Sequence, residues 1–109
     1  MNAAGLRMTL YTIDSVVNSP VWYDEIVKEG VAPDELLGTR KELSYLNKAM
    51  QATPPEKLDA TVAKYDAELT EHSHKFSGEW NANRLAGFRE AQIMIGYVNS
   101  IFHEAGIRP

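Results

Sequence analysis

The three histidines carry the most specific chemistry in this sequence, and His72 has the most suggestive neighbours. Glu68 precedes His72 by four residues, one helical turn, and His103 lies on a later segment. Imidazole and carboxylate groups are common zinc ligands, so Glu68, His72 and His103 are candidate metal ligands. Di-iron bundle proteins need two Glu-x-x-His motifs, and the sequence has only that of Glu71 and His74. We therefore favour a histidine held by Glu68 on an apolar helix face, with no metal and no other cofactor.

Motifs for catalysis are absent from the sequence. It contains no Gly-x-Ser-x-Gly element, no glycine-rich phosphate loop and no His-Glu-x-x-His. It also contains no cysteine, which excludes a disulfide scaffold, a thiolate metal site and a cysteine nucleophile. We expect a protein that is not an enzyme.

Aromatic and basic residues in two regions are candidates for a binding surface. Tryptophan and arginine are enriched at interaction hot spots, and a ring beside a cation can stack against a nucleotide-like anion. The candidates are Tyr11, Trp22, Lys28, Arg40, Trp80 and Arg84. The alternative is that both tryptophans belong to the core and that the charges form a solvated face.

Charge excludes some partners. Residues 1–54 carry five basic and seven acidic side chains, and residues 55–109 carry six and eight, which together give −4. A nucleic-acid partner is not expected, because phosphate binding usually requires a basic stripe. No apolar run reaches the roughly 18–20 residues that span a bilayer. Without cysteines, glycosylation acceptors or a signal-length apolar run, the expected location is the cytoplasm.

Proline positions and apolar spacing predict five helices, over about 9–18, 20–29, 34–50, 55–76 and 81–104. Thr53-Pro54-Pro55-Glu56 is typical of a helix start, with Thr53 as the N-cap. Gly78 is the expected stop before the last helix. Residues 1–18 also allow a strand, because Leu6, Met8 and Leu10 alternate with less apolar residues. A single strand would have no partner, so we favour a helix.

Two of these segments share the spacing of a coiled-coil seam. Apolar residues recur at steps of three and four from Leu36 to Met50 and again from Leu58 to Phe76. The turn between the segments is short, which favours an antiparallel helical hairpin. The predicted fold is therefore a single all-α domain, a four- to five-helix bundle built on this hairpin.

The last helix has an apolar arc much wider than the roughly 100° stripe of a surface helix. Such a helix lies either at the centre of the bundle or at an interface between subunits. The candidate interface residues on its apolar side are Gly87, Ala91, Met94 and Val98. The leading expectation is a small non-enzymatic interaction or regulatory protein that binds another protein and forms a homo-oligomer through this helix. The alternatives are a phage-like inhibitor or sponge, which binds a host protein or a small anionic ligand, and a metal-binding helical bundle.

Overall fold

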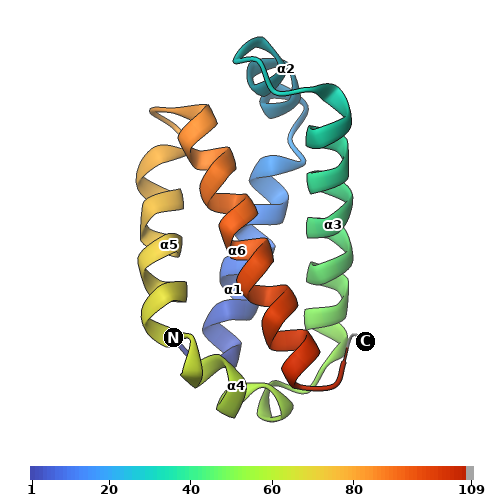
Figure 1. The fold of residues 1–109 in the computed structure, drawn as a ribbon, viewed down its shortest axis with the longest axis vertical. Coiled ribbons are helices and arrows are strands. Elements are labelled where there is room, and N and C mark those ends of the chain that lie inside the picture. The colour runs from blue at the N-terminus through green and yellow to red at the C-terminus, as the bar shows by residue number, and fades with distance from the viewer. Residues whose placement is uncertain (108–109) are drawn as a thin grey trace.

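A computed structural model of the protein describes residues 1–107, and every regular element in that range is helical. The elements are α1 (Ala3–Val17), α2 (Pro20–Lys28), α3 (Pro33–Ala52), the short 3-10 helix η1 (Pro55–Lys57), α4 (Asp59–Lys64), α5 (Asp66–Glu79) and α6 (Arg84–Glu104) (Figure 1). The predicted all-α bundle is confirmed. The strand alternative for residues 1–18 is wrong, because Leu6, Leu10 and Ile13 share the buried side of α1.

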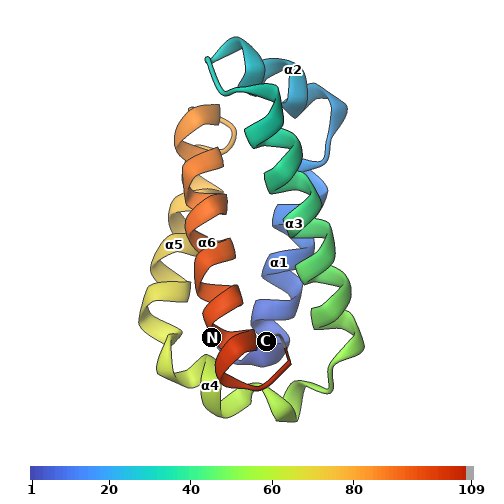
Figure 2. The same ribbon diagram turned by 45° about the vertical axis from the view of Figure 1, so that its right-hand side comes forward.

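The four long helices form two antiparallel pairs, α1 with α3 and α5 with α6. Helix α3 also contacts α6, and residues of α1 and α5 together line a hollow that includes Ile13 and Phe76. Figures 1 and 2 show α2 across one end of the bundle and α4 across the other. Consequently α3 and α5 lie diagonally opposite each other, and the parallel helices α1 and α5 are neighbours.

The predicted hairpin of 34–50 against 55–76 is wrong in its pairing, and residues 55–76 do not form one helix. The chain leaves helical geometry at Thr53, turns through η1, and breaks again at Tyr65. Thr53 donates its hydroxyl to the Ala49 carbonyl at 2.7 Å, so it ends α3 and does not cap a following helix. Leu58 and Val62 are members of the buried core, which explains their seam-like spacing. The apolar spacing correctly indicated which residues are buried. However, α3 packs against α1, and α5 packs against α6.

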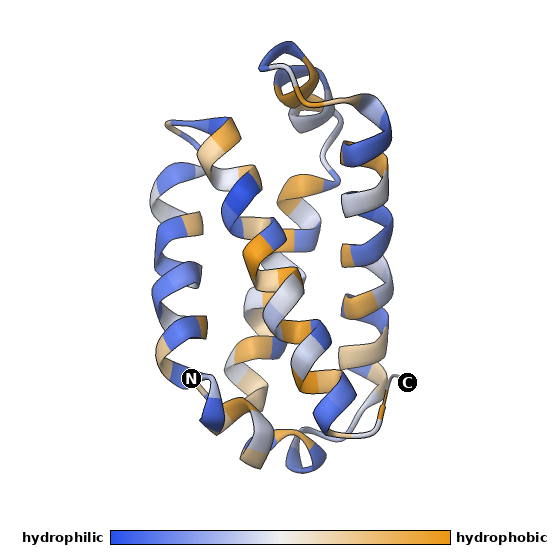
Figure 3. Cartoon of the chain, in the orientation of Figure 1, coloured by the Kyte–Doolittle hydropathy of each residue, from blue (hydrophilic) through white to orange (hydrophobic). Residues whose placement is uncertain are grey.

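One continuous core fills the space between the helices. Trp22 of α2 closes one end, with its ring centroid 6.4 Å from that of Phe76 and 6.3 Å from that of Phe88. Gly78, the expected stop, lies inside α5, which continues to Glu79. Figure 3 shows α5 mostly hydrophilic, whereas α6 has hydrophobic residues along its whole course. Over the described range, no helix combines the length and the apolar content needed to cross a membrane.

Candidate functional site

Of the predicted binding residues, Trp80 and Arg84 lie together. The Arg84 guanidinium lies over the Trp80 ring, 5.5 Å from its centroid, and donates to the Trp80 carbonyl. It also forms an ion pair with Glu25 of α2. Arg84 therefore ties α2 to the start of α6, beside a hollow of about 270 Å³ that Val16 and Val21 help to line. Its charge already has a partner within the chain.

Of the other four predicted binding residues, Trp22 helps to line the same hollow, whereas Tyr11, Lys28 and Arg40 do not. Trp22 is 2% exposed, so most of its side chain belongs to the core, as the alternative reading of the tryptophans expected. Arg40 lies over the Tyr23 ring, 5.6 Å from its centroid, and donates to the carbonyl groups of Asn18 and Ser19, where α1 ends. Lys28 is exposed at the end of α2, and Tyr11 is exposed on α1. The expected aromatic and basic residues do not form one patch.

The candidate metal ligands are also dispersed. His72 Nδ1 lies 2.6 Å from Glu90 Oε2, and its ring stacks on Tyr97 with centroids 5.7 Å apart. The carboxylate that holds His72 thus comes from α6 and is not that of Glu68, as the spacing along one helix had suggested. His103 is exposed near the end of α6. Among residues 1–107, no three histidine or carboxylate side chains are grouped so that they could hold a metal ion.

The four predicted interface residues, Gly87, Ala91, Met94 and Val98, are buried inside the chain itself. Helix α6 contacts α2, α3, α4 and α5, which explains its wide apolar arc. A Cβ at Gly87 would lie 2.7 Å from the Cα of Trp80, so this glycine allows the turn before α6 to pack closely. The prediction that these residues form a surface for another subunit is therefore wrong.

A different side of α6 faces outward. It consists of the exposed residues Arg89, Ile93, Gly96, Ser100 and Glu104 with the half-buried Tyr97 at its edge, and we call it the outer face of α6. These residues lie within about 100° of one another around the helix, at heptad-like spacing. Ile93 is 39% exposed, and a Cβ built on Gly96 would meet no atom within 4 Å. Sequence reasoning missed this face because Ile93, Gly96 and Tyr97 were assigned to the apolar arc or not singled out.

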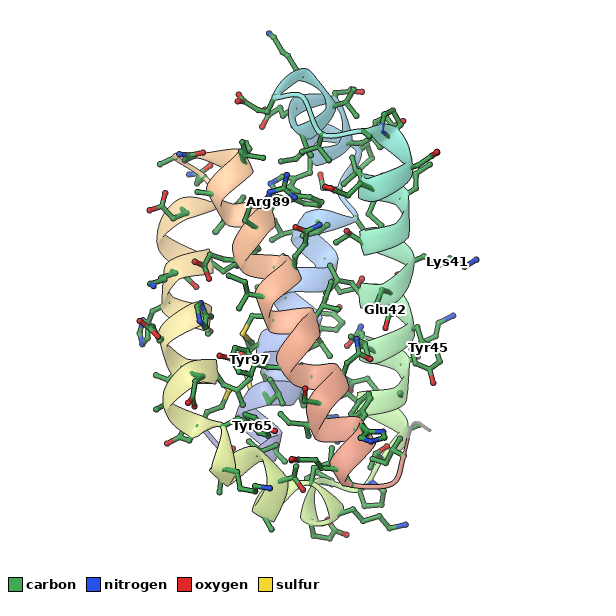
Figure 4. All side chains as sticks on the ribbon, in the orientation of Figure 1. Lys41, Glu42, Tyr45, Tyr65, Arg89 and Tyr97 are labelled. Carbon is green, nitrogen blue, oxygen red and sulfur yellow. The ribbon has the colours of Figure 1, made fainter. Side chains whose placement is uncertain are left out.

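A groove of about 330 Å³ lies along one side of this face and is lined by Tyr65, which lies between α4 and α5, and by Ile93, Gly96, Tyr97 and Ser100 of α6. The Tyr65 and Tyr97 rings lie 5.9 Å apart, and the Tyr65 hydroxyl donates to Glu104 Oε1 at 3.1 Å. Figure 4 shows both tyrosines between α5 and α6, with Arg89 toward the other end of α6. The groove therefore has aromatic walls, and the ion pair of Lys64 with Glu104 lies beside the Tyr65 hydroxyl.

The bond between Tyr65 and Glu104 predicts a specific titration behaviour. Because the hydroxyl donates to a carboxylate, the pKa of Tyr65 is raised above 10.0. A raised folded-state pKa means that this stabilisation is present below the unfolded value and is lost as the pH rises through the folded value. We expect Glu104→Gln to lower the pH at which Tyr65 ionises. Tyrosinate absorbance measures this ionisation, and the Tyr65→Phe variant shows which part of the absorbance change belongs to Tyr65. Superimposable titration curves for Glu104→Gln and the unchanged protein would contradict this.

Comparison with known proteins adds no relationship: no protein family model, curated protein or solved structure matches the chain. A function for this protein has to come from its own geometry.

Proposed function

We propose that this protein is a small non-enzymatic interaction protein that pairs with a second copy of itself through the outer face of α6. The observation that supports this most directly is Gly96, an exposed glycine in the middle of a long helix. Glycine there destabilises a helix by about 0.5–1 kcal/mol relative to alanine. Nothing within the chain requires it, since a Cβ would meet open space, as it would at the exposed helical glycines Gly38 and Gly78; Gly96 differs from them in lying between Ile93 and the tyrosine-lined groove. A missing side chain at this point allows another backbone to approach closely.

The surroundings of Gly96 suit contact with protein. Ile93 supplies exposed apolar surface, and Tyr65 and Tyr97 supply aromatic groups of the kind enriched at interfaces. The Ser100 hydroxyl donates to the Gly96 carbonyl at 3.2 Å, so it keeps a hydrogen bond when water is removed. Covering Ser100 therefore leaves its hydroxyl hydrogen-bonded.

The proposed dimer is weak. The face from Arg89 to Glu104 is about 22 Å long at 1.5 Å per residue, and a standard interface buries about 800 Å² on each partner. A single helix face with its flanking tyrosines is smaller than that, so we expect micromolar rather than nanomolar affinity.

The ligand-sponge alternative has less support. The guanidinium groups of Arg84 and Arg40 are both engaged, one by a carboxylate and the other by backbone carbonyls. A cytoplasmic location is part of the proposal, because the sequence contains no cysteine and no Asn-x-Ser/Thr acceptor.

The proposal predicts that Ile93→Glu weakens self-association at least about tenfold, or about 1.4 kcal/mol, because a charge is buried without a partner. Sedimentation equilibrium measures the dissociation constant, and circular dichroism checks the fold. Leu37→Glu is the matched control, since Leu37 is 50% exposed on α3 and lies outside the face. A single-chain mass at every concentration of the unchanged protein would contradict the proposal. So would a dimer that is lost in Met8→Glu, on α1, and kept in Ile93→Glu.

A further inference from the structure

We infer that the outward side of α1 binds a peptide segment of another protein, one in which an apolar side chain lies next to a carboxylate. This inference goes beyond the proposed self-association and does not depend on it. Helices α1 and α6 each lie between α3 and α5, on opposite sides of the bundle (Figure 1). A second copy bound at the outer face of α6 therefore leaves α1 uncovered.

The outward side of α1 differs from the rest of the surface in carrying no charge. Its exposed residues are Ala4, Met8, Tyr11, Thr12 and Ser15. Helices α2, α3, α5 and α6 each expose both acidic and basic residues. Met8 is 73% exposed and Tyr11 is 59% exposed. Methionine, tyrosine and arginine are enriched in protein interfaces, so the composition of this side favours contact with protein.

The exposed hydroxyl groups of this side already have partners within α1. The Thr12 hydroxyl donates to the Met8 carbonyl at 3.1 Å, and the Ser15 hydroxyl donates to the Tyr11 carbonyl at 2.9 Å. Both groups keep a hydrogen bond when a bound segment displaces water, so covering them leaves no unsatisfied donor.

Two hollows flank Met8 and Thr12. The first, of about 290 Å³, lies between α1 and α3 and is lined by Arg7, Met8, Tyr11, Thr12 and Gln51. The second, of about 240 Å³, lies between α1 and α5, where Phe76 forms part of the wall. Met8 and Thr12 line both hollows and so form a ridge between them. The first hollow offers an apolar side chain of the partner contact with both Met8 and Tyr11.

Arg7 determines the charge that this hollow prefers. Its Nε donates to Gln51 Oε1 and its Nη2 to the Gln51 carbonyl, both at 2.8 Å. Both acceptors are uncharged, and the two bonds leave part of the five-donor guanidinium unused. Arg84 and Arg89 each form an ion pair, whereas no carboxylate among residues 1–107 pairs with Arg7. A carboxylate next to the apolar side chain of the partner supplies the missing counter-charge.

The same features disfavour a nucleic acid as the occupant. Binding to a phosphate backbone requires several cations, and Arg7 is the one basic residue that lines the hollow. The net charge of the chain is −4, which repels a polyanion. A short acidic and apolar peptide matches one arginine beside an apolar hollow.

Three peptides that differ at one position test this inference. They are acetyl-Leu-Phe-Glu-Leu-amide and its counterparts with glutamine or lysine in place of the glutamate. Titration of each into isotope-labelled protein, followed by NMR, locates binding through the backbone amides of Met8, Tyr11 and Thr12. We expect the glutamate peptide to bind there with a dissociation constant on the order of 1 mM. It should bind about two- to fivefold more tightly than the glutamine peptide, and the lysine peptide should bind most weakly.

Two protein variants assign this preference to Arg7. Arg7→Gln should make the glutamate and glutamine peptides bind equally. Lys41→Gln is the matched control, because it changes the net charge by the same amount on α3, where Lys41 projects away from the bundle (Figure 4). This control should keep the preference for the glutamate peptide. The NMR spectrum of each variant also checks its fold.

Three results would overturn the inference and leave the proposed dimer intact. They are no shift at the α1 amides up to about 10 mM peptide, a glutamate peptide that binds no more tightly than the other two, and a preference that survives Arg7→Gln. Loss of the dimer in Met8→Glu but not in Ile93→Glu would overturn both proposals, because a second copy would then occupy α1. Weaker dimerisation of Ile93→Glu alone is compatible with both.

Discussion

Replacing Trp22 by alanine is expected to lower the free energy of unfolding by about 3–5 kcal/mol. The indole is 2% exposed and lies between Phe76 of α5 and Phe88 of α6. It anchors α2, which has only nine residues and is too short to be stable without packing. Loss of the ring therefore leaves a large cavity and also releases the helix that covers this end of the bundle.

Urea unfolding followed by circular dichroism measures this loss. Tyr11→Ala is the matched control, because Tyr11 is an aromatic residue with 59% of its surface exposed. We expect that control to change stability by no more than about 0.5 kcal/mol. Equal stability changes for Trp22→Ala and Tyr11→Ala would show that Trp22 does not hold α2 in place.

The second large effect comes from one substitution made at two glycines of the same helix. Gly87→Ala is expected to destabilise the protein by about 1–3 kcal/mol, because the new Cβ would lie 2.7 Å from the Trp80 Cα and the backbone has to move. Gly96→Ala is expected to stabilise the folded chain by about 0.5–1 kcal/mol, because alanine favours the helix and meets open space. The difference between the two variants isolates the contact with Trp80, since the gain in helix propensity is shared.

Thermal unfolding of both variants, at a concentration low enough to keep the protein monomeric, shows whether each substitution raises or lowers the stability of the fold. The proposed dimer gives Gly96→Ala a second readout, since a methyl group on the outer face of α6 should weaken self-association while the fold becomes more stable. Equal stability of the two alanine variants would contradict the close packing of Trp80 on Gly87.

Local features of the fold were predictable from the sequence, and the partners of each helix were not. Pro20 and Pro33 begin α2 and α3 as expected, because a proline suits the first turn of a helix wherever that helix packs. The apolar spacing of α3 and α5 correctly marks their buried sides. It cannot tell which helix covers them, since one buried stripe is compatible with any apolar neighbour.

The candidate site shows the same division between local and spatial information. His72 was correctly placed on a seam, but its partner Glu90 is eighteen residues away on another helix. Gly87 and Gly96 look alike in the sequence. In the structure the backbone at Trp80 packs against Gly87, whereas no atom lies within 4 Å of a Cβ built on Gly96. The outer face of α6 can be identified only when the helices that pack against α6 are known. It is the part of the α6 surface that those helices do not cover.

The diagonal crossing from α3 to α5 has an electrostatic consequence. It makes α1 and α5 parallel neighbours, so the beginnings of both helices, where the peptide dipoles concentrate positive charge, lie at the same end of the bundle. The first turn of α1 contains no acidic residue. The crossing segment supplies one, since Asp59 of α4 accepts a hydrogen bond from the Ala3 amide at 3.2 Å. Asp66, in the first turn of α5, pairs with the terminal ammonium group, which lowers the pKa of Asp66. The same stretch of chain that brings two positive helix ends together thus places a carboxylate at each of them.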